Sequence, residues 1–573
     1  MALLSLAAAF VLLGLSTIAT HGWTEIYADQ WRLYPIYLEQ AFPANVLALE
    51  NGHRPVFPGL VRVAELHLLD GNQKLQLAVG GLLALATVLV LAFIAWRDAR
   101  AGLVARALAT ALAAFAVFWL GNARMLLHGN ESVHAYLLTA CLAGGIALVL
   151  RDPLPRPALG LAALLAFIAT FSFGPGMATF PALALVLVLQ RRYRPAVWMG
   201  VALLATLLLY FALPGATGVR NSLQLRPFAS LLTAATWLAS MPVNLFDAAF
   251  DPDAGRSLPS WLRAILQPIA QGYRAHAGDI RVQHGPATAL GLFAMATLLW
   301  ATFTTWRDQA NQQRLRLAGL ALAWFGAGVA VIVALGRLGY FQDHPDQMFA
   351  HRYLPWSCLF WLGWFWVVLG RSGKWHWPFG AGVAIASVLM LGMGLATSTG
   401  YRIWGELIRD GLRVDSAGIA MGHLVADRPQ LGESHVEHIE AALPAVRGAG
   451  ISMFAWPESK LLGSRIPVPT TPGPAFAGEI ETANPVANRL DSAPSLYLEI
   501  RMHAVDAKPP GRLLVLDGER RVVGMVVRGA AGGAWRYRGF ARVPSLDDGL
   551  VLADRNGSLN IPLAGAGVIS RTD

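Results

Sequence analysis

Uninterrupted apolar runs restrict what this chain can fold into more than any other feature. Residues 75–95 and 378–397 contain no charged residue, and each reaches the roughly 20 residues that a helix needs to cross a bilayer. A surface helix of a soluble protein would carry a polar face over that length. Of the 573 residues, 55% are hydrophobic and only 14% are charged, which excludes an ordinary soluble protein. The sequence predicts a mainly α, polytopic transmembrane helical bundle.

The apolar runs predict about eleven transmembrane helices. The first run is apolar and ends in small residues, so a cleaved signal peptide is the alternative; it lacks a basic start, and we interpret it as a span. The predicted spans are residues 2–20, 75–95, 105–121, 135–150, 158–172, 177–190, 196–213, 286–304, 317–336, 354–370 and 378–397.

Basic residues are distributed unevenly between the loops. If the spans alternate, one set of short loops contains only Arg124, Arg337 and Arg352, and the positive-inside rule places the other set in the cytoplasm. The net charge of +10 then reflects topology, and no nucleic acid is expected as a partner. The cytoplasmic set is Arg97, Arg100, Arg106, Arg151, Arg156, Arg191, Arg192, Arg194, Arg307, Arg314, Arg316, Arg371 and Lys374.

This topology divides the chain into two predicted domains. A change of composition after residue 397, a Pro-rich passage at 466–472 and short β-rich runs beyond it predict a soluble tail with a small antiparallel sheet or sandwich. The β-rich runs are residues 496–504, 512–516, 521–528 and 535–542. The predicted parts are a transmembrane domain at 1–397 with outer loops at 21–74 and 214–285, and an extracytoplasmic domain at 398–573 with a helical connector at 398–470 and a β-rich part at 471–573.

Two segments depart from the pattern of plain spans. Residues 228–246 are apolar enough to cross, but counting them as a span would invert the later loops, so we expect a re-entrant or interfacial helix. Pro and Gly interrupt the apolar pattern at residues 173–176, where irregular backbone at membrane depth needs protein or water to satisfy its polar groups. That break either lines a site or forms a tight turn.

Ionisable residues collect in the predicted outer loops. Carboxylates beside Arg and His suit a transfer reaction on a phosphate-linked substrate, because a carboxylate can accept a proton and Arg can hold phosphate oxygens. The same residues also occur in solvated loops. The candidate residues in these loops include Glu25, Asp29, Glu50, His53, Arg54, Arg124, His128, Arg337, His351, Arg352 and Tyr353.

No motif predicts a cofactor or a metal site. Cys141 and Cys358 lie inside apolar runs, which excludes a disulfide framework. His344 and His351 are seven residues apart in a predicted loop, a spacing typical of no particular metal site. A divalent metal is left open, and we assign no metal ligand.

The order of several motifs resembles polytopic bacterial envelope proteins related to the GT-C class of glycosyltransferases. These motifs are Ala28-Asp29-Gln30-Trp31, then residues 50–58, residues 170–176, Gly336-Arg337 and Arg352-Tyr353. The resemblance covers about the first 400 residues. It implies a bacterial inner-membrane enzyme that moves a sugar from a polyprenyl-phosphate carrier to an envelope saccharide acceptor on the outer side.

The resemblance also implies roles for single residues. Asp29 would be the catalytic base, with Glu25 as the nearest substitute, and His53, Arg54, Arg337 and Arg352 would be candidates to bind the phosphate. Relatives often carry two adjacent acids where this chain has Ala28 beside Asp29, which puts a metal-assisted reaction in doubt and leaves a non-catalytic member open. The alternatives are a transporter or flippase of a lipid-linked saccharide, and a non-catalytic assembly or anchoring protein.

Overall fold

The computed structural model describes residues 1–564 apart from ten gaps. Residues 565–573 lie outside the described part of the chain. The gaps are residues 214–225, 251–259, 280, 309–311, 371–376, 426–435, 469–475, 505–508, 530–534 and 547–548. Arg371, Lys374 and the second half of the predicted Pro-rich passage therefore lie outside the described residues.

The chain folds into two compact units. The helical unit comprises residues 1–22, 46–62 and 75–405, and the barrel unit comprises residues 23–45, 63–74 and 406–573. The long loop predicted at 21–74 is thus shared between them. Each unit is described by itself below.

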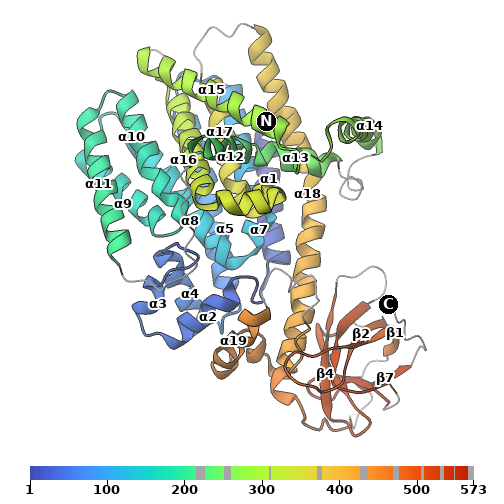
Figure 1. Cartoon of the computed structure of the whole chain (residues 1–573). Coiled ribbons are helices and arrows are strands. Elements are labelled where there is room, and N and C mark those ends of the chain that lie inside the picture. Colours follow the sequence, from blue (N-terminus) through green and yellow to red (C-terminus); the bar gives the residue numbers. More distant parts are fainter. Residues whose placement is uncertain are drawn as a thin grey trace. The chain divides into compact units, whose positions relative to one another are not determined.

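Within the described part of the chain, eight helices are long and apolar enough to cross a membrane. They indicate a membrane protein and coincide with eight of the predicted spans (Figure 1). Since a helix satisfies its own backbone hydrogen bonds, it is the form that an apolar segment takes in lipid. These helices are α1 (Ala2–His21), α5 (Lys74–Trp96), α6 (Leu103–Phe118) continued by η1 (Leu120–Asn122) and α7 (Ala123–Leu127), α8 (Gly129–Val149), α11 (Tyr193–Ala212), α15 (Gly285–Arg307), α16 (Arg314–Asp343) and α18 (Trp377–Ala420).

The other three predicted spans are shorter helices. They are α9 (Arg156–Thr170), α10 (Thr179–Leu189) and α17 (Leu354–Leu369), with 15, 11 and 16 residues. Each falls short of the roughly 20 residues of a full crossing. The total of about eleven spans therefore stays a prediction.

Three breaks interrupt the apolar helices of the helical unit. α12 (Pro227–Leu238) meets α13 (Ser240–Phe250) at a bend of 44°, in the segment predicted to be re-entrant or interfacial. The 3₁₀ helix η2 (Gly174–Ala178) separates α9 from α10, at the predicted Pro and Gly break. Within α16, Arg337 leaves helical geometry with φ −134° and ψ 15°.

Small residues bring α16 and α17 together. A Cβ atom on Gly319 would lie 2.7 Å from the carbonyl oxygen of Gly363, and one on Gly363 would lie 2.4 Å from the backbone nitrogen of Ala323. Glycine lets two helices of a membrane protein approach this closely. The contact holds in place the segment between them, which contains η5 (Pro345–Phe349) and η6 (His351–Tyr353).

The remaining helices are short. They are α2 (Gln30–Glu39), α3 (Ala44–Leu47), α4 (Val56–Leu68), α14 (Ser260–Ala277), α19 (Val436–Gly448), η7 (Ser452–Ala455) and η8 (Pro457–Leu461).

A closed seven-stranded β-barrel forms most of the C-terminal region. Its strand order is β1-β2-β5-β4-β3-β6-β7, antiparallel throughout except where β1 pairs with β7. The predicted β-rich runs correspond to β2 to β5, and the antiparallel sheet expected there closes into a barrel, which was not predicted. The strands are β1 (Phe476–Val486), β2 (Ser495–Ala504), β3 (Arg512–Leu516), β4 (Val522–Arg528), β5 (Trp535–Ala541), β6 (Val551–Ala553) and β7 (Ile561–Ala564).

Alternation along β2 shows how the sequence specifies the barrel. Leu498, Ile500 and Met502 are fully buried in the barrel core, while Glu499 and Arg501 between them point outward. Successive side chains of a strand face opposite sides, so this period of two buries one face only.

Candidate functional site

A two-residue hairpin organises the polar residues of the helical unit. Glu50 and His53 exchange backbone hydrogen bonds of 2.8 Å in both directions, and Asn51 and Gly52 between them have φ of 49° and 79°. Two positive φ values are the mark of a type I′ turn, for which Asn-Gly is the preferred sequence. Because Glu50 and His53 are directly opposed, their side chains project from the same face of the hairpin.

The Glu50 carboxylate is buried and paired. It accepts a hydrogen bond from the guanidinium of Arg62 on α4, which also donates to the side-chain oxygen of Asn130 on α8. His134, one turn further along α8, places Nε2 4.0 Å from the second oxygen of Glu50. A buried carboxylate needs such partners, because an uncompensated charge away from water is costly. The predicted substrate residue Glu50 is thus engaged in a buried ion pair.

His53 contacts the broken segment between α9 and α10. Its ring meets the edge of Phe173 at 4.8 Å between centroids, and Phe173 also stacks with His134 at 5.7 Å. A Cβ on Gly174 would lie 2.3 Å from Nδ1 of His53, so a larger residue there would have to displace the imidazole ring. The Pro and Gly break therefore packs on the Glu50–His53 hairpin.

Burial lowers the pKa of His53 to about 4, and the positive charge of Arg337 lowers it further while Glu50 opposes the shift. The imidazole is therefore neutral at pH 7 and can both donate and accept a hydrogen bond. The influence of Arg337 shows that the kinked part of α16 brings a cation toward the hairpin.

A second group of residues follows the turn from α7 into α8. Arg124 donates to both oxygens of Glu131, at 3.0 and 3.1 Å, and His128 lies 3.7 Å from the same carboxylate. Fork-like Arg–carboxylate contacts of this kind fix both side chains. The structure thus brings the predicted residues Arg124 and His128 together around Glu131.

The positive charges of Arg281 and Arg124 act on His351. It meets the rings of Tyr401 and Trp404 edge-on, at 5.6 and 5.2 Å between centroids. Burial lowers the pKa of His351 to about 3, and the charges of Arg281 and Arg124 lower it further. Two arginines and a neutral imidazole therefore share this part of the helical unit.

Arg337 and Arg352 differ from the other arginines of this region. Arg124 and Arg281 are paired with Glu131 and with Asp247, whereas, among the residues that the structure describes, Arg337 and Arg352 lie within 4 Å of no carboxylate. Arg337 lies over the ring of Tyr340 at 5.8 Å. Arg352 lies over the ring of Tyr353 at 5.1 Å and donates to Gln347 at 3.4 Å. Neither Arg337 nor Arg352 is thus held in an ion pair within the described residues, although Asp343 and Asp346 belong to the same segment between α16 and α17.

The contacts of Arg54 indicate a role other than the predicted binding of phosphate. Its guanidinium donates to the backbone oxygens of Tyr210, at 2.7 Å, of Leu47, at 2.9 Å, and of Leu213. The last carbonyls of a helix lack partners within the helix and carry partial negative charge. These contacts favour a cap on the C-terminus of α11, and the predicted phosphate role of Arg54 stays a prediction.

The barrel unit contains the two predicted catalytic acids. Glu25 is only 4% exposed and accepts hydrogen bonds from the backbone and hydroxyl of Thr24, at 3.1 and 2.8 Å, with Arg413 at 3.6 Å. Burial raises the pKa of Glu25, and Arg413 opposes that shift. Glu25 is thus held in a protein environment rather than presented to water.

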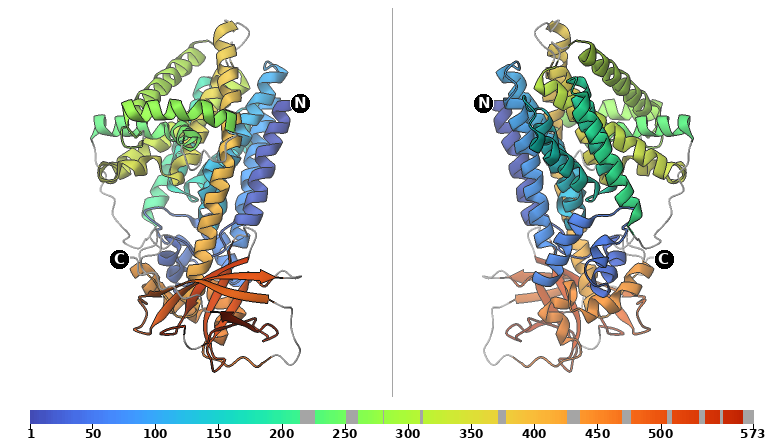
Figure 2. Two further views of the ribbon diagram at one scale, coloured as in Figure 1. Left: turned by 90° about the vertical axis from the view of Figure 1, so that its right-hand side faces the viewer. Right: turned by 90° about the vertical axis from the view of Figure 1, so that its left-hand side faces the viewer.

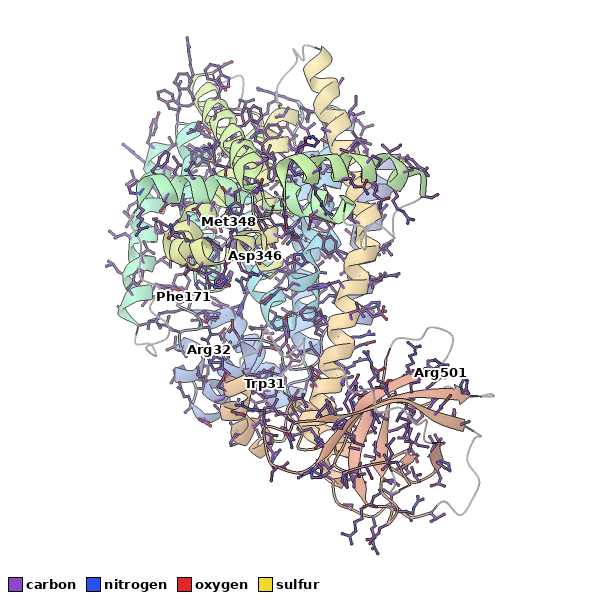
Figure 3. All side chains as sticks on the ribbon, turned by 45° about the vertical axis from the view of Figure 1, so that its right-hand side comes forward. Trp31, Arg32, Phe171, Asp346, Met348 and Arg501 are labelled. Carbon is purple, nitrogen blue, oxygen red and sulfur yellow. The ribbon has the colours of Figure 1, made fainter. Side chains whose placement is uncertain are left out.

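Asp29 stands at the N-cap of α2 with 57% of its side chain exposed. Arg32, one turn along the helix, approaches its carboxylate at 3.5 Å, while the neighbouring Trp31 is buried. Both Trp31 and Arg32 are labelled in Figure 3. Ala28 before it has φ 52°, a conformation that residues other than Gly, Asn and Asp seldom adopt. Of the two predicted catalytic acids, Asp29 is the one accessible to a substrate.

Three polar residues of the helical unit, Arg62, Asn130 and Arg281, were not predicted as site residues. A signal for Arg62 was present, since it is a charge inside the otherwise apolar run 55–64. Among the described residues, no three His, Cys, Asp or Glu side chains are grouped as they would be around a metal ion.

Comparison of the chain with protein-family models, with curated proteins and with solved structures finds no match.

Proposed function

We propose that this protein is a cell-envelope glycosyltransferase that moves a sugar from a polyprenyl-phosphate carrier to a saccharide acceptor on the extracytoplasmic side. The observation that carries the proposal is that Arg337 and Arg352, beside the α16–α17 junction, form no ion pair with a carboxylate in the described structure, unlike Arg124 and Arg281. A phosphate or diphosphate is the anion that such arginines suit best, because guanidinium groups bind its oxygens in pairs.

In this proposal the phosphate of the carrier lies between Arg337 and Arg352, with neutral His53 and His351 as hydrogen-bonding groups beside it. The order of motifs that resembles GT-C enzymes supports the same assignment, since it includes Gly336-Arg337 and Arg352-Tyr353. Asp29 is the proposed base that takes the proton from the acceptor hydroxyl, because it is exposed, whereas Glu25 and Glu50 are buried with partners.

The proposed topology has eleven spans, with α9, α10 and α17 completing the eight membrane-length helices. Short helices can serve as spans where neighbouring helices rather than lipid surround them. Basic loops then face the cytoplasm of a bacterial inner membrane, and the outer loops and the barrel are extracytoplasmic.

A second candidate function, transport of a lipid-linked saccharide, is favoured by one observation. The 44° bend between α12 and α13 is a break in addition to the one at η2. Broken helices line the binding sites of many transporters.

The test is turnover by the full-length protein in nanodiscs with a panel of polyprenyl-phosphate sugars. Sugar release should fall at least about 10²-fold in Asp29→Asn, since a positioned base contributes that much. Arg352→Gln should raise KM for the donor, while the matched control Arg156→Gln, an exposed arginine in a basic loop, should not. A folded protein that releases no sugar from any donor, but moves labelled lipid-linked saccharide across proteoliposomes, would establish the transporter instead.

A further inference from the structure

α14 is amphipathic, and the large apolar residues of one side are among its most exposed side chains. Trp261, Ile265 and Ile269 are 65%, 56% and 54% exposed, and their spacing of four residues places them along one side of the helix. Arg263 and Gln267, which point to the other side, are less exposed. The helix is not among those that are apolar enough to cross a membrane.

The polar side of α14 is attached to the rest of the helical unit. Tyr273 meets Phe246 of α13 edge-on at 5.4 Å between ring centroids, and Arg274 lies 3.7 Å from Asp247, the carboxylate that also pairs with Arg281. The orientation of the helix about its own axis is therefore fixed. Its apolar side is the one turned away from the protein residues that the structure describes.

The C-terminal end of α14 is tied to the beginning of a membrane-length helix. Only residues 278–284 separate it from α15, and even fully extended they reach about 25 Å. Turn hydrogen bonds from Gly278 to Arg274, at 3.0 Å, and from Gln283 to Asp279, at 2.7 Å, shorten that reach. Since α15 starts where it enters the membrane, α14 must end near the membrane surface.

The direction of α14 agrees with a position in that surface. It is seen nearly end-on in Figure 1 and lengthwise in the left view of Figure 2, where it runs across the direction of α1 and α5 of the same unit. A helix that crosses the direction of the spanning helices lies along the bilayer plane. Helices with a strongly apolar side and a polar opposite side bind at the boundary between headgroups and acyl chains.

We propose that α14 is a membrane-interface helix, with Trp261, Ile265 and Ile269 inserted between the headgroups and upper acyl chains of the lipid that surrounds α15. Lipid is the occupant that continuity indicates, because α15 exposes Phe293, at 59%, and Leu299, at 54%, to the same bilayer. Tryptophan is also enriched at this depth. This inference concerns the anchoring of the second large outer loop and does not depend on the proposed transfer reaction.

The test places one fluorescent probe at a time on the full-length protein in lipid nanodiscs. An environment-sensitive dye is attached to Ile265→Cys, to Gln271→Cys as the matched exposed but polar position on α14, and to Leu299→Cys on α15. The native Cys141 and Cys358 are buried, and the protein without an added cysteine measures their background labelling. Quenching by aqueous iodide is compared with quenching by lipids that carry a nitroxide near the headgroup or deep in the acyl chain.

The Ile265 probe should be quenched by the shallow nitroxide and at least about threefold less by iodide than the Gln271 probe. The Leu299 probe should respond most to the deep nitroxide. Iodide quenching of the Ile265 probe equal to that of the Gln271 probe would overturn the proposal, as would strongest quenching by the deep nitroxide, which would make α14 a span. Protection from iodide without any response to nitroxide lipids would also overturn it, and would indicate a protein partner.

Discussion

The regions around Glu50 and around Asp29 hold their carboxylates in opposite environments. In the helical unit, Glu50 is closed in by Arg62 and has His134 within 4.0 Å, whereas in the barrel unit Asp29 exposes 57% of its side chain at the start of a helix. A buried carboxylate with buried partners stabilises the fold and is poorly placed to exchange a proton with a substrate. Replacement of an exposed carboxylate changes the free energy of unfolding little. The difference teaches that burial, rather than residue type, separates the structural acids from the candidate catalytic one.

Breaking the buried pair should have the largest effect on stability. Arg62→Met leaves the Glu50 charge without its main partner and should cost roughly 3–5 kcal/mol of unfolding free energy. Thermal unfolding in detergent can be followed with a thiol-reactive dye, because Cys141 and Cys358 become accessible only on unfolding. The double variant with Glu50→Gln should recover part of the loss. Arg32→Met, which removes the partner of exposed Asp29, is the matched control, and an equal loss in both single variants would contradict the comparison.

The packing of the hairpin on the broken segment gives the next largest effect. Gly174→Ala would force a Cβ against His53 and should destabilise by about 1–3 kcal/mol, as overpacked positions do. Gly160→Ala in α9 is the control, because nothing lies within 4 Å of a Cβ there. If the two variants unfold at the same temperature, the hairpin does not pack on η2 as described.

The pH dependence of stability tests the burial of His53, which lies opposite Glu50 in the hairpin. Its folded pKa of about 4 lies below the ordinary 6.5, so the unfolded chain binds the extra proton first. The contribution of neutral His53 to the free energy of unfolding is therefore complete above pH 6.5. That contribution falls by roughly 1–2 kcal/mol as the pH falls toward 4, after allowance for the partial exposure of the side chain. His53→Gln should flatten the pH dependence of the unfolding temperature between these values. An unchanged slope would show that folding does not shift the pKa of His53.

Asp29→Asn should have the smallest effect on stability, within about 0.5 kcal/mol, because the side chain is exposed. The same variant is expected to lower turnover at least about 10²-fold, so stability and activity should separate at this residue and at no buried acid. A marked loss of stability in Asp29→Asn would instead give Asp29 a structural role.

The sequence was most informative where one physical pattern dominates. Eight apolar runs became membrane-length helices because lipid permits little else, and β2 to β5 follow the alternation of buried and exposed residues. Barrel closure was not predicted, because it depends on the pairing of β1 with β7, which are far apart in the chain. Local pattern thus predicts elements better than their pairing.

The candidate site was predicted less completely for a related reason. The Asn51-Gly52 turn is a local signal, and it explains why Glu50 and His53 belong together. The partnership of Glu50 with Arg62, and the proximity of Arg281 to His351, arise from packing between separate helices. Residue types in a loop cannot show which of them will be neutralised by a neighbour.

The closed barrel has a consequence for how the C-terminal region can recognise anything. Sheets that end in an unpaired strand can recruit a peptide by adding it as a further strand, and they risk aggregating by the same route. Here Gly478 and Glu479 of β1 pair with Leu563 and Ala564 of β7, so both outermost strands are occupied in the described structure. A molecule that binds this region is therefore expected to contact outward side chains and connecting loops rather than to extend the sheet by a further strand.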